Sequence, residues 1–335
     1  MNRYKKSFIY FNILLTLMFL NTGFALGEGR RLIVDAEIES YIKSLIKPLT
    51  TVAKLDNNSL TIHLVEDESL NAFVTRGQKL FLHTGLLINT KNPAQLRGIL
   101  AHEIGHIAEG HLARTSKVLR TSSNITLLGV ILGTATAAVT GRSEAAAAIF
   151  HGTKNMANKA FLKHSRTQES AADHAALRYL KKNQQTAQGL LEFLMTLKKK
   201  ELLSTTNRSS YLDTHPLTDD RIEFVREHIK KSVHISQEEP SINIARHSRM
   251  VGKLIGFLHP PSKTFTQYPN PTTNIAAKYA RVIGLHRNLE TKKALIFLNE
   301  LIENSPSDAY FWELKGQLLF ETSQPMKAQN AYQKA

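Results

Sequence analysis

The sequence predicts an α+β fold that is mainly helical, has one small β-sheet, and continues into an α-helical C-terminal region. Helical periodicity over residues 35–52 and 92–108 predicts two of the helices. Alternating apolar residues over 60–65 and 71–87 predict short strands between them. A repeat of 34 residues near the C-terminus predicts paired helices there.

The first 27 residues have the composition of a secretory signal peptide. Basic residues within the first six precede a mostly apolar stretch over 8–24, and small residues follow. Cleavage after Ala25 or Gly27 fits equally well. An uncleaved membrane anchor is the alternative, although polar residues dilute the apolar stretch. The pattern predicts export to a bacterial periplasm, with residues 1–27 as the signal.

The composition excludes several kinds of chemistry. The chain has no cysteine, which excludes disulfides, thiolate metal ligands and a thiol nucleophile, and suits an oxidising compartment. The formal charge is +15, and removal of residues 1–27 takes away three bases and no acid, which leaves +12. The bases are spread out and belong to no nucleic-acid-binding module, so we predict no nucleic-acid partner. Anionic membrane surfaces or acidic partners fit the charge better.

Residues 102–106 spell the motif H-E-x-x-H. Because residues four apart share one face of an α-helix, His102 and His106 present two imidazoles to one metal ion. Glu103 lies beside them, placed to accept a proton from the attacking water. Asparagine followed by proline at 92–93 predicts the start of this helix. The motif predicts a catalytic site that holds one zinc ion per chain.

A catalytic zinc ion needs a third protein ligand. His111 lies nine residues beyond His102, about half a turn away on a continuous helix, so we expect it to face away. Glu169 on a separate downstream helix would complete a His₂Glu set, and Asp173 would accept the free N–H of a ligating histidine. A solvated helix face is the alternative, but the small residues at 170–176 favour close packing against another helix.

Residues 71–87 are predicted to form a strand pair with its turn at 76–78. Strands next to such a motif helix commonly offer an edge to which an extended peptide adds. Asn71, Ala72 and Phe73 are therefore predicted to form the substrate edge strand.

Residues 121–141 carry no charge, and three interpretations stay open. The segment is a helix packed in or against the domain, a membrane-touching amphipathic segment, or a membrane span. Peripheral membrane contact through 121–141 is thus one of the predicted interactions.

Further helices are predicted at 168–180 and 188–203, and five prolines mark 234–274 as an interdomain region. Beyond it, alanines, aromatic residues and a glycine at tetratricopeptide spacing predict repeats over 275–335, fewer than two in number. An ordinary helical hairpin is the alternative there.

These motifs, in this order, resemble the M48 family of zinc metallopeptidases, and most closely its periplasmic, repeat-bearing branch of the β-barrel assembly-enhancing type. The matching segments are Asn71-Ala72-Phe73, Thr84-Gly85-Leu86, the H-E-x-x-H helix at 100–106, Glu169-Ser170-Ala171-Ala172-Asp173, and Thr214-His215-Pro216 with Arg221. The resemblance covers residues 28–232 and implies a gluzincin-type metallopeptidase domain, with 233–274 as the interdomain region.

The resemblance also implies that Glu169 is the third zinc ligand and that His215 lies near the metal. His215 precedes a proline, which fixes an extended backbone suited to aiming its imidazole. It then either coordinates zinc and holds the enzyme inactive, or stabilises the oxyanion of the transition state. Arg221 either pairs with a carboxylate near the site or caps the loop.

Two functions follow from these patterns. The favoured one is a zinc metalloendopeptidase of the periplasm that acts on protein substrates in the quality control or assembly of outer-membrane proteins, with membrane association as a further expectation. The other is a periplasmic chaperone or adaptor whose repeats bind the outer-membrane β-barrel assembly machinery, with a seldom active zinc site. An intact H-E-x-x-H favours the enzyme, since a scaffold has no use for Glu103.

Overall fold

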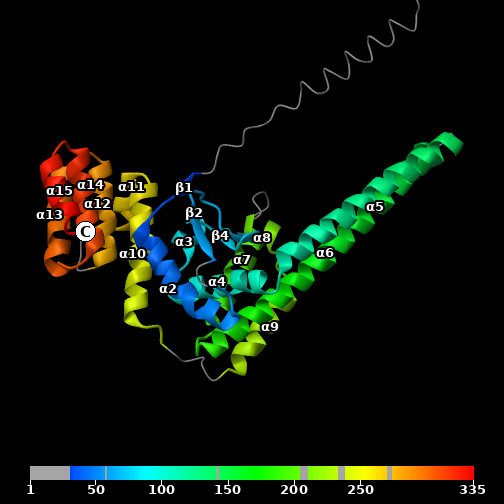
Figure 1. Ribbon diagram of the computed structural model, residues 1–335, viewed down its shortest axis with the longest axis horizontal. Helices are drawn as coiled ribbons and strands as arrows, with labels where there is room; N and C mark the ends of the chain where they lie inside the picture. Colours follow the sequence, from blue (N-terminus) through cyan, green and yellow to red (C-terminus); the bar gives the residue numbers. More distant parts are fainter. Residues whose placement is uncertain (1–30, 57–58, 141–142, 204–209, 233–237, 270–273) are drawn as a thin grey trace, which may run out of the picture. The chain divides into compact units, whose positions relative to one another are not determined.

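Four short strands form one mixed sheet (Figure 1). The computed structural model describes residues 31–56, 59–140, 143–203, 210–232, 238–269 and 274–335; the predicted signal peptide, residues 1–27, lies outside them. The strand order is β1–β2–β4–β3, with β1 (Leu32–Ile33), β2 (Thr61–Val65), β3 (Ala72–Thr75) and β4 (Lys79–His83).

Strand β3 lies at one edge of the sheet, antiparallel to β4, while β2 and β4 run parallel. Gly77 and Gln78 take left-handed φ angles of 80° and 55° in the turn between β3 and β4. The predicted strand pair and its turn are confirmed. Only the predicted end of the strand pair at residue 87 was wrong, because helix α3 (Thr84–Asn89) begins directly after β4.

Side-chain caps fix the start of two predicted helices, α2 (Ala36–Ala53) and α4 (Pro93–Ala108). The side chains of Asp35 and Asn92 each accept a backbone N–H three residues on, both at 2.9 Å. Both predicted helices are confirmed, and almost every residue of α4 is buried.

Helices α5 (His111–Thr140) and α6 (Ser143–Lys182) lie side by side as a long hairpin that extends away from the other helices (Figure 1). Helix α6 is much longer than the predicted 168–180. The prediction missed its first part because residues 143–167 lack the apolar stripe from which a helix is recognised. The uncharged segment 121–141 falls on α5, apart from residue 141, and packs on α6. No helix in the described part of the chain has the length and apolar character that crossing a membrane requires.

Helices α4 and α6 cross in close contact at Gly105. A Cβ atom on Gly105 would lie 2.9 Å from the carbonyl oxygen of Ala172 and 3.2 Å from Cβ of Ala175. Both alanines are fully buried, so the close approach predicted from the small residues is confirmed. This crossing sets the motif helix directly against residues 169–173.

Helix α7 (Gln188–Leu203) has the predicted bounds and packs on α4. Helices α8 (Ser210–Thr214) and α9 (Asp219–Lys230) follow, and α9 packs on α7 and α6. These helices, α2 and the sheet enclose the main apolar core.

The stretch predicted as an interdomain region contains α10 (Ser241–Leu258) and α11 (Pro261–Gln267). Met250 and Leu254 of α10 belong to the main core, whereas Phe257 packs against a second core. Four C-terminal helices build this second core and its surroundings: α12 (Ile275–Arg287), α13 (Thr291–Asn304), α14 (Ala309–Glu321) and α15 (Pro325–Tyr332).

Small residues allow these C-terminal helices to pack closely in sequence order. Ala294 and Ala328 are buried, and a Cβ atom on Gly316 would lie 2.7 Å from the ring of Tyr332. The assignment of residues 275–335 as tetratricopeptide repeats stays a prediction.

A buried ionic network joins α2 to α10, α12 and α14. Glu37 of α2 accepts hydrogen bonds from Lys253 Nζ at 2.9 Å and from the Tyr279 hydroxyl at 3.1 Å, and it pairs with Arg249. Arg249 also donates to Asp308, the residue that caps the start of α14, at 3.0 Å. One carboxylate therefore ties the N-terminal helix to the C-terminal ones.

Replacing Glu37 should destabilise the whole described fold. Glu37→Ala leaves buried Lys253 and partly buried Arg249 with one carboxylate fewer, which should lower the free energy of unfolding by about 3 kcal/mol in urea titrations. Glu39→Ala is the matched control, because Glu39 makes only an exposed pair with Lys43 in the same helix. The control should lose less than about 0.5 kcal/mol; equal losses would show that the network does not stabilise the fold.

Candidate metal centre

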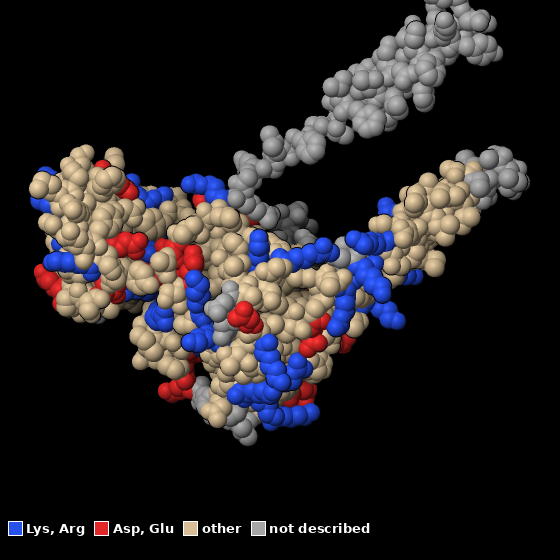
Figure 2. Space-filling model, in the orientation of Figure 1, with Lys and Arg blue, Asp and Glu red and all other residues tan. Residues whose placement is uncertain are grey.

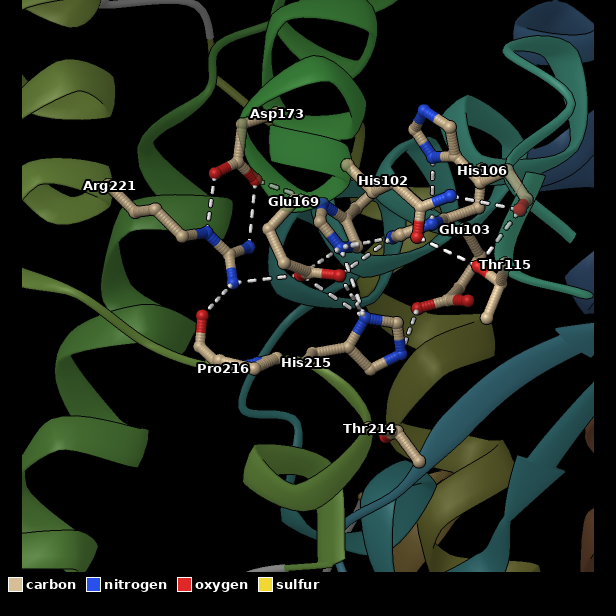
Figure 3. Close-up of polar contacts among 12 residues, drawn as sticks. His102, Glu103, His106, Thr115, Glu169, Asp173, Thr214, His215, Pro216 and Arg221 are labelled. Atoms are coloured by element: carbon tan, nitrogen blue, oxygen red, sulfur yellow. Dashed lines mark hydrogen bonds and ion pairs between the residues drawn. The ribbon is translucent and has the colours of Figure 1, made fainter. Parts of the chain in front are cut away.

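Three histidines and one carboxylate from three segments converge on one point (Figure 3). His102 and His106 come from α4, Glu169 from α6, and His215 from the segment after α8. One donor atom of each lies within 4.8 Å of the others, and all four side chains are buried. A single ion bound at about 2 Å from each ligand spans such a set.

The hydrogen bond of His102 orients its inner nitrogen towards this point. Nδ1–H donates to Asp173 Oδ1 at 2.9 Å, which leaves a lone pair on Nε2 of the neutral ring. That Nε2 lies 3.1 Å from His106 Nε2 and 3.2 Å from Glu169 Oε2. Electron pairs therefore converge where a cation would be bound.

His215 is held between the cluster and the edge of the sheet. Its Nε2 lies 3.3 Å from the Ala72 carbonyl oxygen, to which Nε2–H donates, and its Nδ1 lies 3.2 Å from Glu169 Oε1. The ring stacks on buried Tyr211 with the centroids 4.5 Å apart. Sequence reasoning missed this tyrosine, although it lies only four residues before His215, whose N–H donates to the Tyr211 carbonyl oxygen at 2.7 Å.

Glu103 is fully buried, and neither of its carboxylate oxygens has a hydrogen-bond partner. His215 Nε2 lies 3.4 Å from Oε1. Burial raises the pKa of Glu103 above its ordinary value. A carboxylate with free lone pairs beside a set of nitrogen and oxygen donors is suited to accept a proton from water. These residues fit the zinc ion that the motif predicts.

Arg221 supports the carboxylates from behind (Figure 3). Its Nε donates to Asp173 at 2.6 Å, and its Nη1 lies 2.9 Å from Glu169 and donates to the Pro216 carbonyl oxygen at 3.0 Å. Both roles considered for Arg221, pairing with a carboxylate and capping the loop, are thus realised in one side chain.

The charges of this arrangement shift several pKa values. Burial opposes the charged forms, but Arg221 and His102 outweigh it at Asp173 and lower the pKa to about 2. Burial would also raise the pKa of Glu169, yet His215 and Arg221 hold it well below its ordinary value. At His102, the two carboxylates overcome burial and raise the pKa to about 9. Glu169 and Asp173 therefore stay ionised despite their burial, and Glu169 can offer a charged oxygen to a cation.

A cleft of about 560 Å³ opens beside this cluster. Residues of β3, both helices of the α5–α6 hairpin and the His215 loop line it, among them Phe73, Leu112, Leu162 and His164. Of the predicted edge-strand residues, Phe73 lines the cleft and Ala72 directs its carbonyl to His215, whereas Asn71 is buried just before β3. The cleft thus runs from the edge of the sheet to the cluster.

Comparison with known proteins agrees with this geometry. Residues 35–229 match the model of peptidase family M48. The chain belongs to this family. M48 metallopeptidases are zinc-dependent, and His102, His106, Glu169 and His215 of this M48 chain are the residues that could bind a single metal ion.

Several curated relatives are similar over most of this M48 chain. It is 26% identical to the β-barrel assembly-enhancing protease of Yersinia pestis over 286 residues, which cover 84% of this chain and 58% of that protein. The same identity and coverage hold over 290 residues for the protein of that name from Escherichia coli K12. The mitochondrial metalloendopeptidase OMA1 of Saccharomyces cerevisiae is 26% identical over 217 residues, 61% of this chain and 59% of the relative. The chain matches less than two thirds of the length of these relatives.

His111 lies beside the cluster, so the expectation that it faces away was wrong. The reason is that α4 ends at Ala108, and Gly110, with a φ of 66°, turns the chain before α5 begins. His111 Nδ1 lies 3.0 Å from Nδ1 of His106, and Gln168 Nε2 donates to the His111 carbonyl oxygen at 2.9 Å. His111 therefore supports a ligand from outside the four-residue set. Gly110 was the sequence signal that could have revealed it.

Removing the charge of Asp173 should weaken metal binding without removing a ligand. Asp173→Asn loses the carboxylate that accepts the N–H of His102, so the zinc Kd should rise about 10- to 100-fold in chelator competition. Glu109→Gln is the control, since Glu109 directly follows α4, the helix that carries His102, but pairs on the surface with Arg178. Unchanged affinity in Asp173→Asn, or an equal loss in the control, would contradict this role.

Proposed function

We propose that this chain is a zinc metalloendopeptidase that hydrolyses peptide bonds in protein substrates. The observation that carries the proposal is Glu103, a buried carboxylate without a hydrogen-bond partner, next to four metal donors at the end of a cleft. His102, His106 and Glu169 are the proposed zinc ligands. When bound, zinc would polarise the scissile carbonyl and lower the pKa of water.

The residues around the metal would carry the remaining steps. An extended peptide would add to the edge strand β3, whose Ala72 carbonyl faces His215 at the cleft. Glu103 would accept a proton from the attacking water and pass it to the leaving amine. Asp173 and Arg221 would keep His102 and Glu169 in position, since each is bonded to one or both of them.

The same carboxylate argues against the adaptor hypothesis. Burying a carboxylate without a partner costs free energy, and a scaffold that only binds partners gains nothing from it. An enzyme gains a base with a raised pKa, directly beside its metal. We therefore favour catalysis over a purely adaptor function.

The cellular role is a further part of the proposal. The relatives named β-barrel assembly-enhancing proteases, together with the predicted signal at 1–27, support action in the periplasm on the assembly or quality control of outer-membrane proteins. We propose that residues 28–232 form the catalytic unit, that 275–335 are repeats that contact the assembly machinery, and that the protein also contacts a membrane surface.

Two substitutions separate the base from the ligands. Glu103→Gln should keep about one zinc per chain but abolish cleavage of casein, because only the proton acceptor is lost. Glu169→Ala should lose the metal as well, because it removes a ligand. Zinc content by atomic emission and casein cleavage decide this; zinc loss in Glu103→Gln or full retention in Glu169→Ala would overturn the assignment.

His215 distinguishes two modes of control. We propose that its Nδ1 is a fourth, inhibitory ligand, so His215→Ala should raise basal casein cleavage while zinc stays bound. If His215 stabilises the transition state instead, the same change should lower kcat about 100-fold. Lower activity in a folded, zinc-loaded His215→Ala protein would therefore refute the inhibitory role.

A further inference from the structure

The α5–α6 hairpin exposes large apolar side chains along its length. Leu127, Leu128 and Ile131 of α5 are 59%, 54% and 54% exposed, and Met156 of α6 is 65% exposed. A helix of a water-soluble domain normally turns such residues towards its neighbour. Here they face away from the partner helix.

Small residues occupy the contact between the two helices instead. Gly129 of α5 lies so close to α6 that a Cβ atom there would fall 1.9 Å from Thr153 Oγ1, and Gly133, one turn on, is also buried. Helix pairs in lipid have this arrangement, with glycines at the contact between the helices and large residues on the outer surface. In lipid, apolar side chains gain nothing by facing each other.

Positive charge surrounds this apolar surface. Residues 110–168 contain eight lysines and arginines but a single acidic residue. Figure 2 shows the basic side chains gathered where the hairpin leaves the other helices, with an uncharged surface beyond. The described bases within residues 110–168 are all exposed, and none of them forms an ion pair with another described residue: Arg114, Lys117, Arg120, Lys154, Lys159, Lys163 and Arg166.

We propose that the α5–α6 hairpin binds the surface of an anionic lipid membrane. The exposed apolar residues would enter the boundary between headgroups and acyl chains, and the bases would contact lipid phosphates. A bilayer surface fits both features at once, because it offers negative charge next to hydrocarbon. The hairpin would dip into the membrane without crossing it.

The catalytic cleft lies at the base of the same hairpin. Leu112 and Thr115 of α5 line the cleft, as do Leu162 and His164 of α6. Twelve residues separate Thr115 from Leu127, about 18 Å along a helix. A membrane-bound hairpin would thus hold the cleft near the lipid surface, within reach of unfolded chains that emerge there. The lipid binding itself does not depend on the proposed peptidase activity.

Vesicle sedimentation of the full chain tests the proposal. The protein should bind vesicles containing 30 mol% phosphatidylglycerol at least about tenfold more tightly than pure phosphatidylcholine vesicles, and salt should weaken the binding. Lys117→Glu with Arg120→Glu should weaken it about 25-fold, at about fivefold for each base. Leu127→Ser, Leu128→Ser and Ile131→Ser together should weaken it about tenfold or more.

Matched variants on α7 serve as controls. Lys199→Glu with Lys200→Glu changes the net charge as much as the double charge reversal in the hairpin does. Leu202→Ser with Leu203→Ser removes two leucines that are more exposed than those of the hairpin. Both control variants should bind vesicles as the unmodified chain does. Zinc content and casein cleavage should stay unchanged in the hairpin variants, so lipid binding and catalysis can fail separately.

Three binding results would overturn the proposal. These are equal binding to both vesicle types, hairpin variants that bind as tightly as the unmodified chain, and α7 controls that lose binding as the hairpin variants do. A change of oligomeric state in the serine variant, measured by light scattering without vesicles, would instead assign the apolar surface to a second copy of the chain, and the lipid proposal would then be wrong.

Discussion

The contact between α4 and α6 at Gly105 determines where every other part of the centre lies. Helix α4 carries two histidines and the proposed base, and α6 carries the carboxylates that face them. A side chain at Gly105 would collide with the backbone of Ala172, and so would push the two helices apart. Since a displacement of about 1 Å is enough to disrupt a catalytic geometry, this packing contact and the chemistry cannot be separated.

Charge balance is the second constraint on the site. Three carboxylates, Glu103, Glu169 and Asp173, are buried within one small region. Arg221 neutralises part of this charge through Asp173 and Glu169. A divalent cation at the convergence point would neutralise the rest, while Glu103 would keep its lone pairs free. Arg221 is not among the residues that line the cleft, so it stabilises the carboxylates without occupying the place of the substrate.

Two features connect this centre to the remainder of the molecule. The hairpin supplies one wall of the cleft at its base and an apolar, basic surface further out. On the other side, the network around Glu37 joins α2 to the C-terminal helices through α10. Helix α10 packs against both apolar cores, so a displacement of the C-terminal helices would be transmitted through its side chains to the main core.

The sequence alone determined the features that depend on local spacing. These are the motif helix with its asparagine cap, the strand pair with its turn, the bounds of α7, and the choice of Glu169 and Asp173, whose neighbours are small enough for close packing. Periodicity, capping and spacing are local properties, so a single chain segment reveals them.

Tertiary structure decided the rest. His111 was misplaced because one left-handed glycine ended a helix that spacing alone would have continued. The double role of Arg221 arises between segments whose distance in space the sequence does not record. The length of α6 and the outward-facing leucines of α5 were hidden as well, because the hairpin buries glycine and exposes leucine. That reverses the pattern from which a helix face is ordinarily predicted.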